Sequence, residues 1–109
     1  MKKLILLIAF ISLVSIANAQ TAYISNLGNM SGNGYVSVIN LATNDIIKTI
    51  PVGSDPQGIC VSPDGSKVYV ANNPDNTVSV INTATNAITD TIAVGYDPQG
   101  ITVSPDGGK

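Results

Sequence analysis

Short stretches in which apolar and polar residues alternate recur along the chain after residue 20. Such period-2 alternation in β-branched residues is typical of half-buried strands. Beyond the first twenty residues no stretch shows a sustained helical period. The pattern predicts an all-β protein, with Ile88, Ile92 and Val94 on one face of the last clear strand. The four best-defined segments are predicted as strands at 58–62, 67–72, 77–82 and 87–94.

Turn-forming residues separate these segments. The Ser-Pro-Asp-Gly run at 62–65 places proline where its fixed φ suits a type I turn, and glycine where φ is positive. The runs Asn-Pro-Asp-Asn at 73–76 and Ala-Thr-Asn at 84–86 fill the next two connections with similar chemistry. We therefore expect four short antiparallel strands joined by tight turns.

An internal repeat indicates the architecture. Residues 36–67 and 78–109 align without gaps at an offset of 42, and 24 of the 32 aligned positions are identical. Upstream, Tyr-Ile-Ser-Asn at 23–26 corresponds to Tyr-Val-Ala-Asn at 69–72, with four extra residues in the intervening Gly/Asn-rich loop of the first copy. Four antiparallel strands on a period near 40 residues are typical of one β-propeller blade, and such blades stack in rings of roughly 4–8.

These residues resemble the YVTN-type β-propeller repeat proteins, which are named for a Tyr-Val-Thr-Asn strand. Ala71 or Ser25 stands where the family name has Thr. The resemblance covers essentially all of residues 22–109 and implies four-stranded blades. The matching segments are Tyr-Val-Ala-Asn at 69–72, the DPQGI–VSPDG–K runs at 55–67 and 97–109, and TVSVINTATN at 77–86.

We expect residues 20–109 to form a partial β-propeller. The predicted order is strands 2–4 of one blade, a full blade at about 58–94, and strand 1 of the next blade, which makes eight strands. The chain is then a fragment of about two blades, and its partners include the remaining blades of a full-length propeller. Open blade faces expose Val and Ile, so we expect the fragment to be marginally stable or to associate.

The first nineteen residues have the pattern of a secretory signal peptide. Two lysines precede an apolar run at 4–17, and Ala-Asn-Ala at 17–19 has the small-x-small form that signal peptidase recognises. The apolar run is shorter than the ~20 residues that a spanning helix needs. We predict a helical signal peptide at 1–19 and a secreted, extracellular or periplasmic protein, with the cell surface as an alternative and no stable membrane span after cleavage.

Composition narrows the chemistry. The chain has no His, Arg, Glu or Trp, so it offers no imidazole base, imidazole metal ligand or axial His for a haem. After removal of residues 1–19, three Lys remain against seven Asp, a balance without the basic patch of a nucleic-acid-binding protein. Cys60 is the one cysteine, and Thr102 replaces it in the second copy, so we interpret it as a small strand-filling residue. We predict no catalytic residue, no metal site and no cofactor.

The two Asp-Pro-Gln-Gly runs contain the most interesting polar residues. The family resemblance places this loop between the outer strand of one blade and the inner strand of the next, near the channel mouth, where Asp and Gln side chains can bind a cation or polar ligand. The alternative, which we favour, is that Asp and Pro start a turn that Gly58 or Gly100 ends. The weak ligand-binding candidates are Asp55, Gln57, Asp97 and Gln99.

We therefore predict a secreted or cell-surface propeller module with a binding or structural role, as in the surface-layer and adhesion-like proteins that the resemblance suggests. Its expected partners are extracellular protein or carbohydrate. The alternative is a fragment of a propeller enzyme or redox-linked propeller (lactonase-like, lyase or haem/copper-associated) whose active residues lie in other blades. Two nearly identical copies favour the first hypothesis, because an active site usually makes one or two blades diverge.

Overall fold

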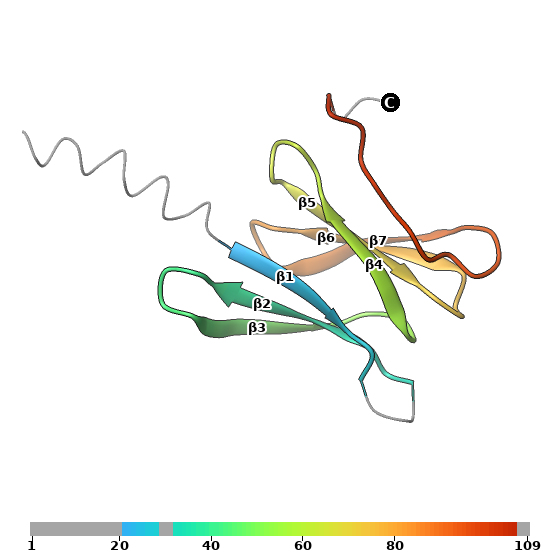
Figure 1. The fold of residues 1–109 in the computed structure, drawn as a ribbon, viewed down its shortest axis with the longest axis horizontal. Coiled ribbons are helices and arrows are strands. Elements are labelled where there is room, and N and C mark those ends of the chain that lie inside the picture. The colour runs from blue at the N-terminus through green and yellow to red at the C-terminus, as the bar shows by residue number, and fades with distance from the viewer. Residues whose placement is uncertain (1–20, 29–31, 107–109) are drawn as a thin grey trace, which may run out of the picture.

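The described part of the chain is entirely β-structure. The computed structural model describes residues 21–28 and 32–106, so the predicted signal peptide lies outside the described residues. Within them the chain forms seven strands, no helix, and two antiparallel sheets (Figure 1). The first sheet has the order β1 (Thr21–Asn26), β2 (Tyr35–Asn40), β3 (Asp45–Pro51), and the second has β4 (Pro56–Val61), β5 (Lys67–Asn72), β6 (Thr77–Asn82), β7 (Ala87–Ala93).

The strands predicted for the complete repeat are present. β5 and β6 have the predicted bounds. β4 begins two residues early and ends one residue early, and β7 ends one residue early. Within the described residues an eighth strand, equivalent to β4, is absent: residues 98–103 are not part of a strand. β4 is hydrogen-bonded to β5, the strand that follows it. Residues 98–103 run beside β4 (Figure 1).

Both sheets contain the same irregularity in register. Pairing shifts between Val38 and Ile39 in the first sheet and between Val80 and Ile81 in the second, 42 residues later. Such a bulge adds one residue to the outer strand and reverses the face on which later side chains lie.

The bulge corrects one prediction about the outer strand β7. Ile88 lies opposite Ile81, whereas Ile92 lies opposite Val78. Ile81 and Val78 are an odd number of residues apart and so point to opposite faces of β6. The prediction that Ile88 and Ile92 share a face is therefore wrong.

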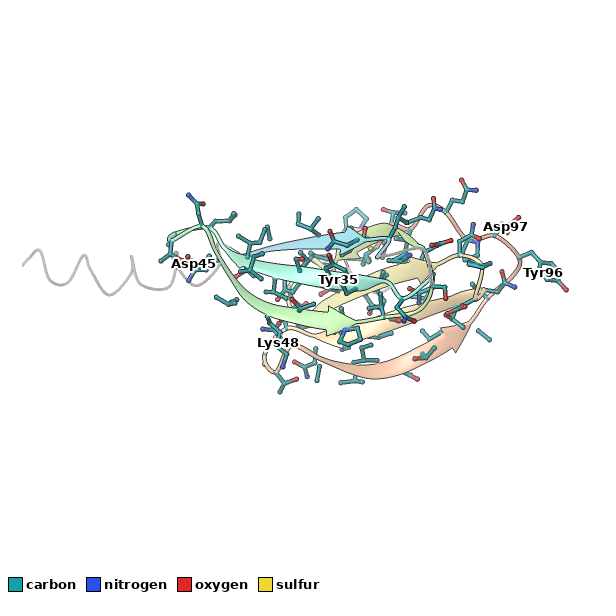
Figure 2. All side chains as sticks on the ribbon, turned by 90° about the horizontal axis from the view of Figure 1, so that it is seen from below. Tyr35, Asp45, Lys48, Tyr96 and Asp97 are labelled. Carbon is teal, nitrogen blue, oxygen red and sulfur yellow. The ribbon has the colours of Figure 1, made fainter. Side chains whose placement is uncertain are left out.

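The hydrophobic core lies between the two sheets. It contains six fully or almost fully buried aliphatic residues, three from each sheet, and burial of such side chains is the main favourable contribution to folding. Figure 2 shows the two sheets stacked face to face. The core residues are Val36, Val38 and Ile50 from the first sheet, and Val68, Val70 and Ile81 from the second.

The turns use the predicted chemistry. Gly65 has φ of +76°, and its N–H donates to the Ser62 carbonyl at 2.8 Å, so the predicted Pro-Asp-Gly turn is confirmed. The β2–β3 and β6–β7 turns are equivalent, because the side chains of Asn40 and Asn82 each accept from the N–H two residues later at 2.8 Å. Among residues 21–28 and 32–106, no helix is long and apolar enough to cross a membrane.

Candidate functional site

The Asp-Pro-Gln-Gly segments follow the last strand of each repeat. Asp55 and Asp97 have positive φ values of 43° and 52°, so the left-handed residue is the aspartate, which tolerates this conformation better than most non-glycine residues. Gly58 lies inside β4 and has no positive φ. The expectation that Gly58 ends the turn is therefore wrong.

Gly58 instead allows two backbone segments to approach each other closely. A Cβ atom added to Gly58 would collide with the backbone carbonyl oxygen of Gln99. Only a residue without a side chain permits this contact between backbones. The structure thus brings the two Asp-Pro-Gln-Gly segments together through their backbones.

The four candidate side chains are mostly in solvent. Asp55 is half-buried, whereas Gln57, Asp97 and Gln99 are exposed, and Figure 2 shows Asp97 beside Tyr96 at the tip of its loop. Within the described residues, no hydrogen bond or ion pair joins these four side chains. The Asp97 N–H donates to Asn76 Oδ1 at 2.9 Å. The segments are therefore organised by backbone contacts, and the candidates do not form one preassembled site.

A groove of about 460 Å³ lies beside the first of these segments and was not predicted. Its wall includes Asn72, which is fully buried and donates from Nδ2 to Ser79 Oγ at 2.9 Å. In the first repeat Asn26 Nδ2 donates to Ser37 Oγ at 3.0 Å. Asn72 Oδ1 is buried and has no partner among the described residues. Both repeats have an Asn at the end of one strand and a Ser in the strand that follows it. This shared pattern could have indicated the amide–hydroxyl pair.

Asp75 connects this groove to the first Asp-Pro-Gln-Gly segment. Its Oδ2 accepts a hydrogen bond from the Ser54 N–H at 2.9 Å. Ser54 belongs to the first repeat and Asp75 to the β5–β6 turn of the second, so the carboxylate joins the two repeats. This contact gives Asp75 a structural role between the two repeats.

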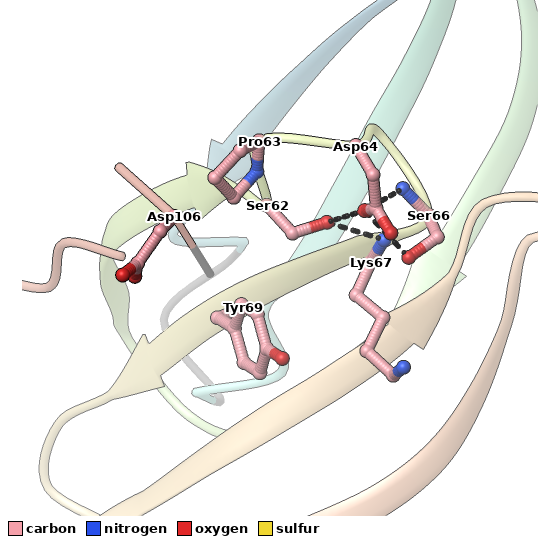
Figure 3. A pocket seen from close by; sticks show the side chains of 7 residues that line it. All are labelled: Ser62, Pro63, Asp64, Ser66, Lys67, Tyr69 and Asp106. Carbon is pink, nitrogen blue, oxygen red and sulfur yellow. Dashed lines mark hydrogen bonds between the residues drawn. The ribbon is translucent and has the colours of Figure 1, made fainter. Parts of the chain in front are cut away.

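The Pro-Asp-Gly turn lines a second, smaller cleft of about 220 Å³ (Figure 3). Asp64 Oδ1 accepts from Ser62 Oγ at 2.7 Å, from the Ser66 N–H at 3.0 Å and from Ser66 Oγ at 2.8 Å. These bonds, the backbone one first, lower the pKa of Asp64 from 3.8 to about 2. Tyr69 and Asp106 lie across the cleft (Figure 3). In the part of the chain that the structure describes, no three His, Cys, Asp or Glu side chains gather as a metal site would require.

Two further titratable groups lie at packed positions. Cys60 is a free, half-buried thiol opposite Tyr69, and burial raises its pKa, which lowers the fraction of reactive thiolate. Burial also raises the pKa of Tyr23, whose hydroxyl donates to Asn86 Oδ1 at 3.2 Å and so links the two sheets. Burial therefore disfavours the ionised form of both groups.

The comparisons with known proteins agree with this architecture. No protein-family model matches the chain, and no curated protein does. Among solved structures, hydrazine synthase of Kuenenia stuttgartiensis is similar, with a TM-score of 0.74 and 32% sequence identity over 81% of this chain. The described fold resembles a β-propeller-type domain. The chain spans 24% of the length of that hydrazine synthase chain.

Proposed function

We propose that this chain is an exported β-propeller repeat module of the YVTN type, with a structural and binding role at or outside the cell surface. The observation that carries the proposal is where the two repeats differ. At the eight positions that differ between residues 36–67 and 78–109, no described residue is buried. Four of the six core residues, Val36, Val38, Ile50 and Ile81, lie at positions that the two stretches share, so the differences between these stretches fall outside the buried positions.

The variation is concentrated on the outer strands. Four of the eight differing positions lie in β3 and β7, including Lys48, which corresponds to Asp90, and Asp45, which corresponds to Ala87. We infer that these exposed, variable strand positions form the recognition or assembly surface of the module. This supports extracellular protein or carbohydrate, and the remaining blades of a longer propeller, as partners.

Export can be tested with a reporter. Residues 1–19 fused to an alkaline phosphatase without its own leader should give periplasmic activity and a mature protein that begins at Gln20. Replacing Leu6 and Leu7 with Lys should abolish both results, because the apolar run is required for recognition. Activity that persists in this variant, or an uncleaved fusion, would contradict the export proposal.

Binding can be tested by NMR titration of the exported chain with Ca²⁺ and with neutral oligosaccharides. Shift changes confined to residues 55–57 and 97–99 would support a ligand role for Asp55, Gln57, Asp97 and Gln99, and Asp55→Asn should reduce them. Asp64→Asn is the matched control, since Asp64 is occupied within its own turn. Changes along β3 and β7 would support the outer strands as the binding surface, and no change anywhere would contradict a role in binding these ligands.

A second candidate function is a propeller portion of a redox or other enzyme. The similarity to hydrazine synthase favours it, at 32% identity over 81% of this chain. In that case the active residues lie in other parts of a longer protein, and this chain supplies scaffold. Measurement of iron and copper in the purified protein distinguishes the two: a stoichiometric metal would favour the enzyme, and a metal-free protein that binds an extracellular ligand would favour the module.

A further inference from the structure

The groove beside Asp75 has a buried hydrogen-bond acceptor in its wall that the described chain leaves unsatisfied. Asn72 is 0% exposed, and its Nδ2 donates to Thr77 Oγ1 at 3.2 Å and to Ser79 Oγ at 2.9 Å. Its Oδ1 is buried and has no hydrogen-bond partner among residues 21–28 and 32–106. A buried acceptor without a partner carries the full cost of its desolvation. A ligand that donates a hydrogen bond to this oxygen would recover that cost.

The unpaired oxygen belongs to the wall of a space large enough for a ligand. Asn72, Thr77 and Ser79 all line the groove of about 460 Å³, and small-molecule sites in proteins measure roughly 300–1,000 Å³. Gly53 also lines it, and a Cβ atom added there would lie 2.8 Å from Asn72 Cγ. A side chain at position 53 would therefore cover the amide. Glycine leaves the amide beside the groove.

The polar groups of the wall define the chemistry of the ligand. Thr77 and Ser79 accept from the Asn72 amide through their oxygens, so each hydroxyl still carries its own hydrogen to donate. Thr91, opposite Ser79 in β7, adds a third hydroxyl. Asn72 Oδ1 requires a donor. A matching ligand must therefore donate and accept within a short distance, which hydroxyl groups do and an ammonium group does not.

The charge of the wall excludes acidic ligands. Asp75 is the one charged residue among those that line the groove in the described chain, and Lys48 lines the adjoining groove instead. An anionic ligand would therefore meet a carboxylate without a compensating cation in the same wall. Val52 and Ile88 add apolar surface. A neutral sugar ring, with C–H groups on its faces and hydroxyls around its rim, matches this combination.

We propose that the groove binds one ring of a neutral sugar, with a sugar hydroxyl donating to Asn72 Oδ1 and others bonded to the hydroxyls of Ser79 and Thr91. This inference rests on the binding role proposed above and gives it a site and a ligand class. The site differs from the Asp-Pro-Gln-Gly candidates, because it is formed by the end of β3, the β5–β6 hairpin and β7.

The side-chain amides test the site directly. An isotope-labelled 109-residue chain is titrated with glucose, galactose, mannose and N-acetylglucosamine to tens of millimolar, and the NMR signals of the Asn72 and Asn26 amides are followed. At least one sugar should shift the Asn72 signals, because a hydroxyl that donates to Oδ1 polarises the amide. Asn26, the half-buried equivalent in the first repeat, is the internal control and should not shift.

Paired variants test the groove itself. Thr91 is exposed on the outer strand, so Thr91→Leu removes a hydroxyl and adds bulk to the groove without disturbing the core. It should weaken sugar binding by about tenfold or more. Thr49→Leu is the matched control, since Thr49 occupies the equivalent position in β3 and does not line the groove. Glucuronate, in which a carboxylate replaces the terminal hydroxymethyl group of glucose, should bind more weakly than glucose.

Three results would overturn the inference: no shift at Asn72 with any of these sugars, equal shifts at Asn72 and Asn26, or an unchanged affinity in Thr91→Leu. Glucuronate that binds as tightly as glucose would also overturn it, because the ligand would not then be selected for neutrality. Shifts confined to residues 55–57 and 97–99 would overturn the groove as the site and would still support the proposed binding module. The two failures are therefore distinguishable.

Discussion

The close approach between repeats at Gly53 makes a quantitative prediction. A Cβ atom at this position would lie 2.5 Å from Asp75 Oδ2 and 2.8 Å from Asn72 Cγ. Asn72 is fully buried and held by hydrogen bonds from its amide, so it yields less readily than a flexible side chain would. Overpacking of this kind costs about 1–3 kcal/mol. Gly53→Ala should therefore lower the free energy of unfolding by about that amount.

Gly95→Ala is the matched control, because Gly95 occupies the same position of the second repeat. An added Cβ there has no atom within 4 Å, and Gly95 is not among the residues with positive φ. A Gly→Ala change without strain stabilises by about 0.4–1 kcal/mol through the unfolded chain. Gly95→Ala should therefore leave the isolated molecule as stable as the parent chain, or slightly more stable.

Urea unfolding followed by circular dichroism at about 1 μM, where association is least, measures both variants. For a domain of this size each kcal/mol corresponds to about 4–8 °C in Tm, so thermal unfolding provides a second measure. Equal effects of the two substitutions would refute the reasoning, because they would show that Gly53 is not enclosed by the second repeat.

Three further predictions concern hydrogen bonds. Tyr23→Phe removes the bond between the sheets and should cost about 0.5–1.5 kcal/mol in urea unfolding; no change would show that the bond is not formed in solution. Ser79→Ala deprives the buried Asn72 amide of a partner and should cost about 1–3 kcal/mol, more than Ser37→Ala in the less buried first repeat; the opposite order would contradict this account. Because the pKa of Asp64 in the folded chain is about 2, below its ordinary 3.8, its stabilising contribution is present above about pH 4 and lost as the pH falls towards 2. The loss of unfolding free energy between pH 5 and pH 2.5 should therefore be smaller in Asp64→Asn than in the parent chain. An equal loss in both proteins would be evidence against this role of Asp64.

Much of the local structure was predictable from the sequence. Alternating β-branched residues and the Pro-Asp-Gly turn identify β5 and β6 to the residue, because strand and turn preferences act over a few neighbouring positions. The repeat also predicts equivalent sheets, and the structure has two with the same bulge. What the alternation could not predict is the bulge itself, which places Ile88 and Ile92 on opposite faces.

The candidate site was predicted less well, because its geometry depends on contacts between repeats. Glycine is common in turns, but Gly58 lies in a strand. There the backbone of Gln99 leaves no room for a side chain. That approach joins residues about one repeat apart, so no local pattern contains it. The amide–hydroxyl pair of Asn72 and Ser79 was similarly hidden, since both residues are common in exposed turns. Residues 98–103 have a strand-like sequence but form no strand, which local alternation could not predict.

The central claim is that each repeat is one stacking unit to which a further repeat can be added. Appending a further copy of residues 68–109 after Lys109 tests it most directly, by hydrogen exchange and urea unfolding. We expect the amides of residues 98–103 to become protected as that segment pairs with the added strand, and the free energy of unfolding to rise by the contribution of one added interface. Unprotected amides at 98–103 together with an unchanged free energy of unfolding would contradict the central claim.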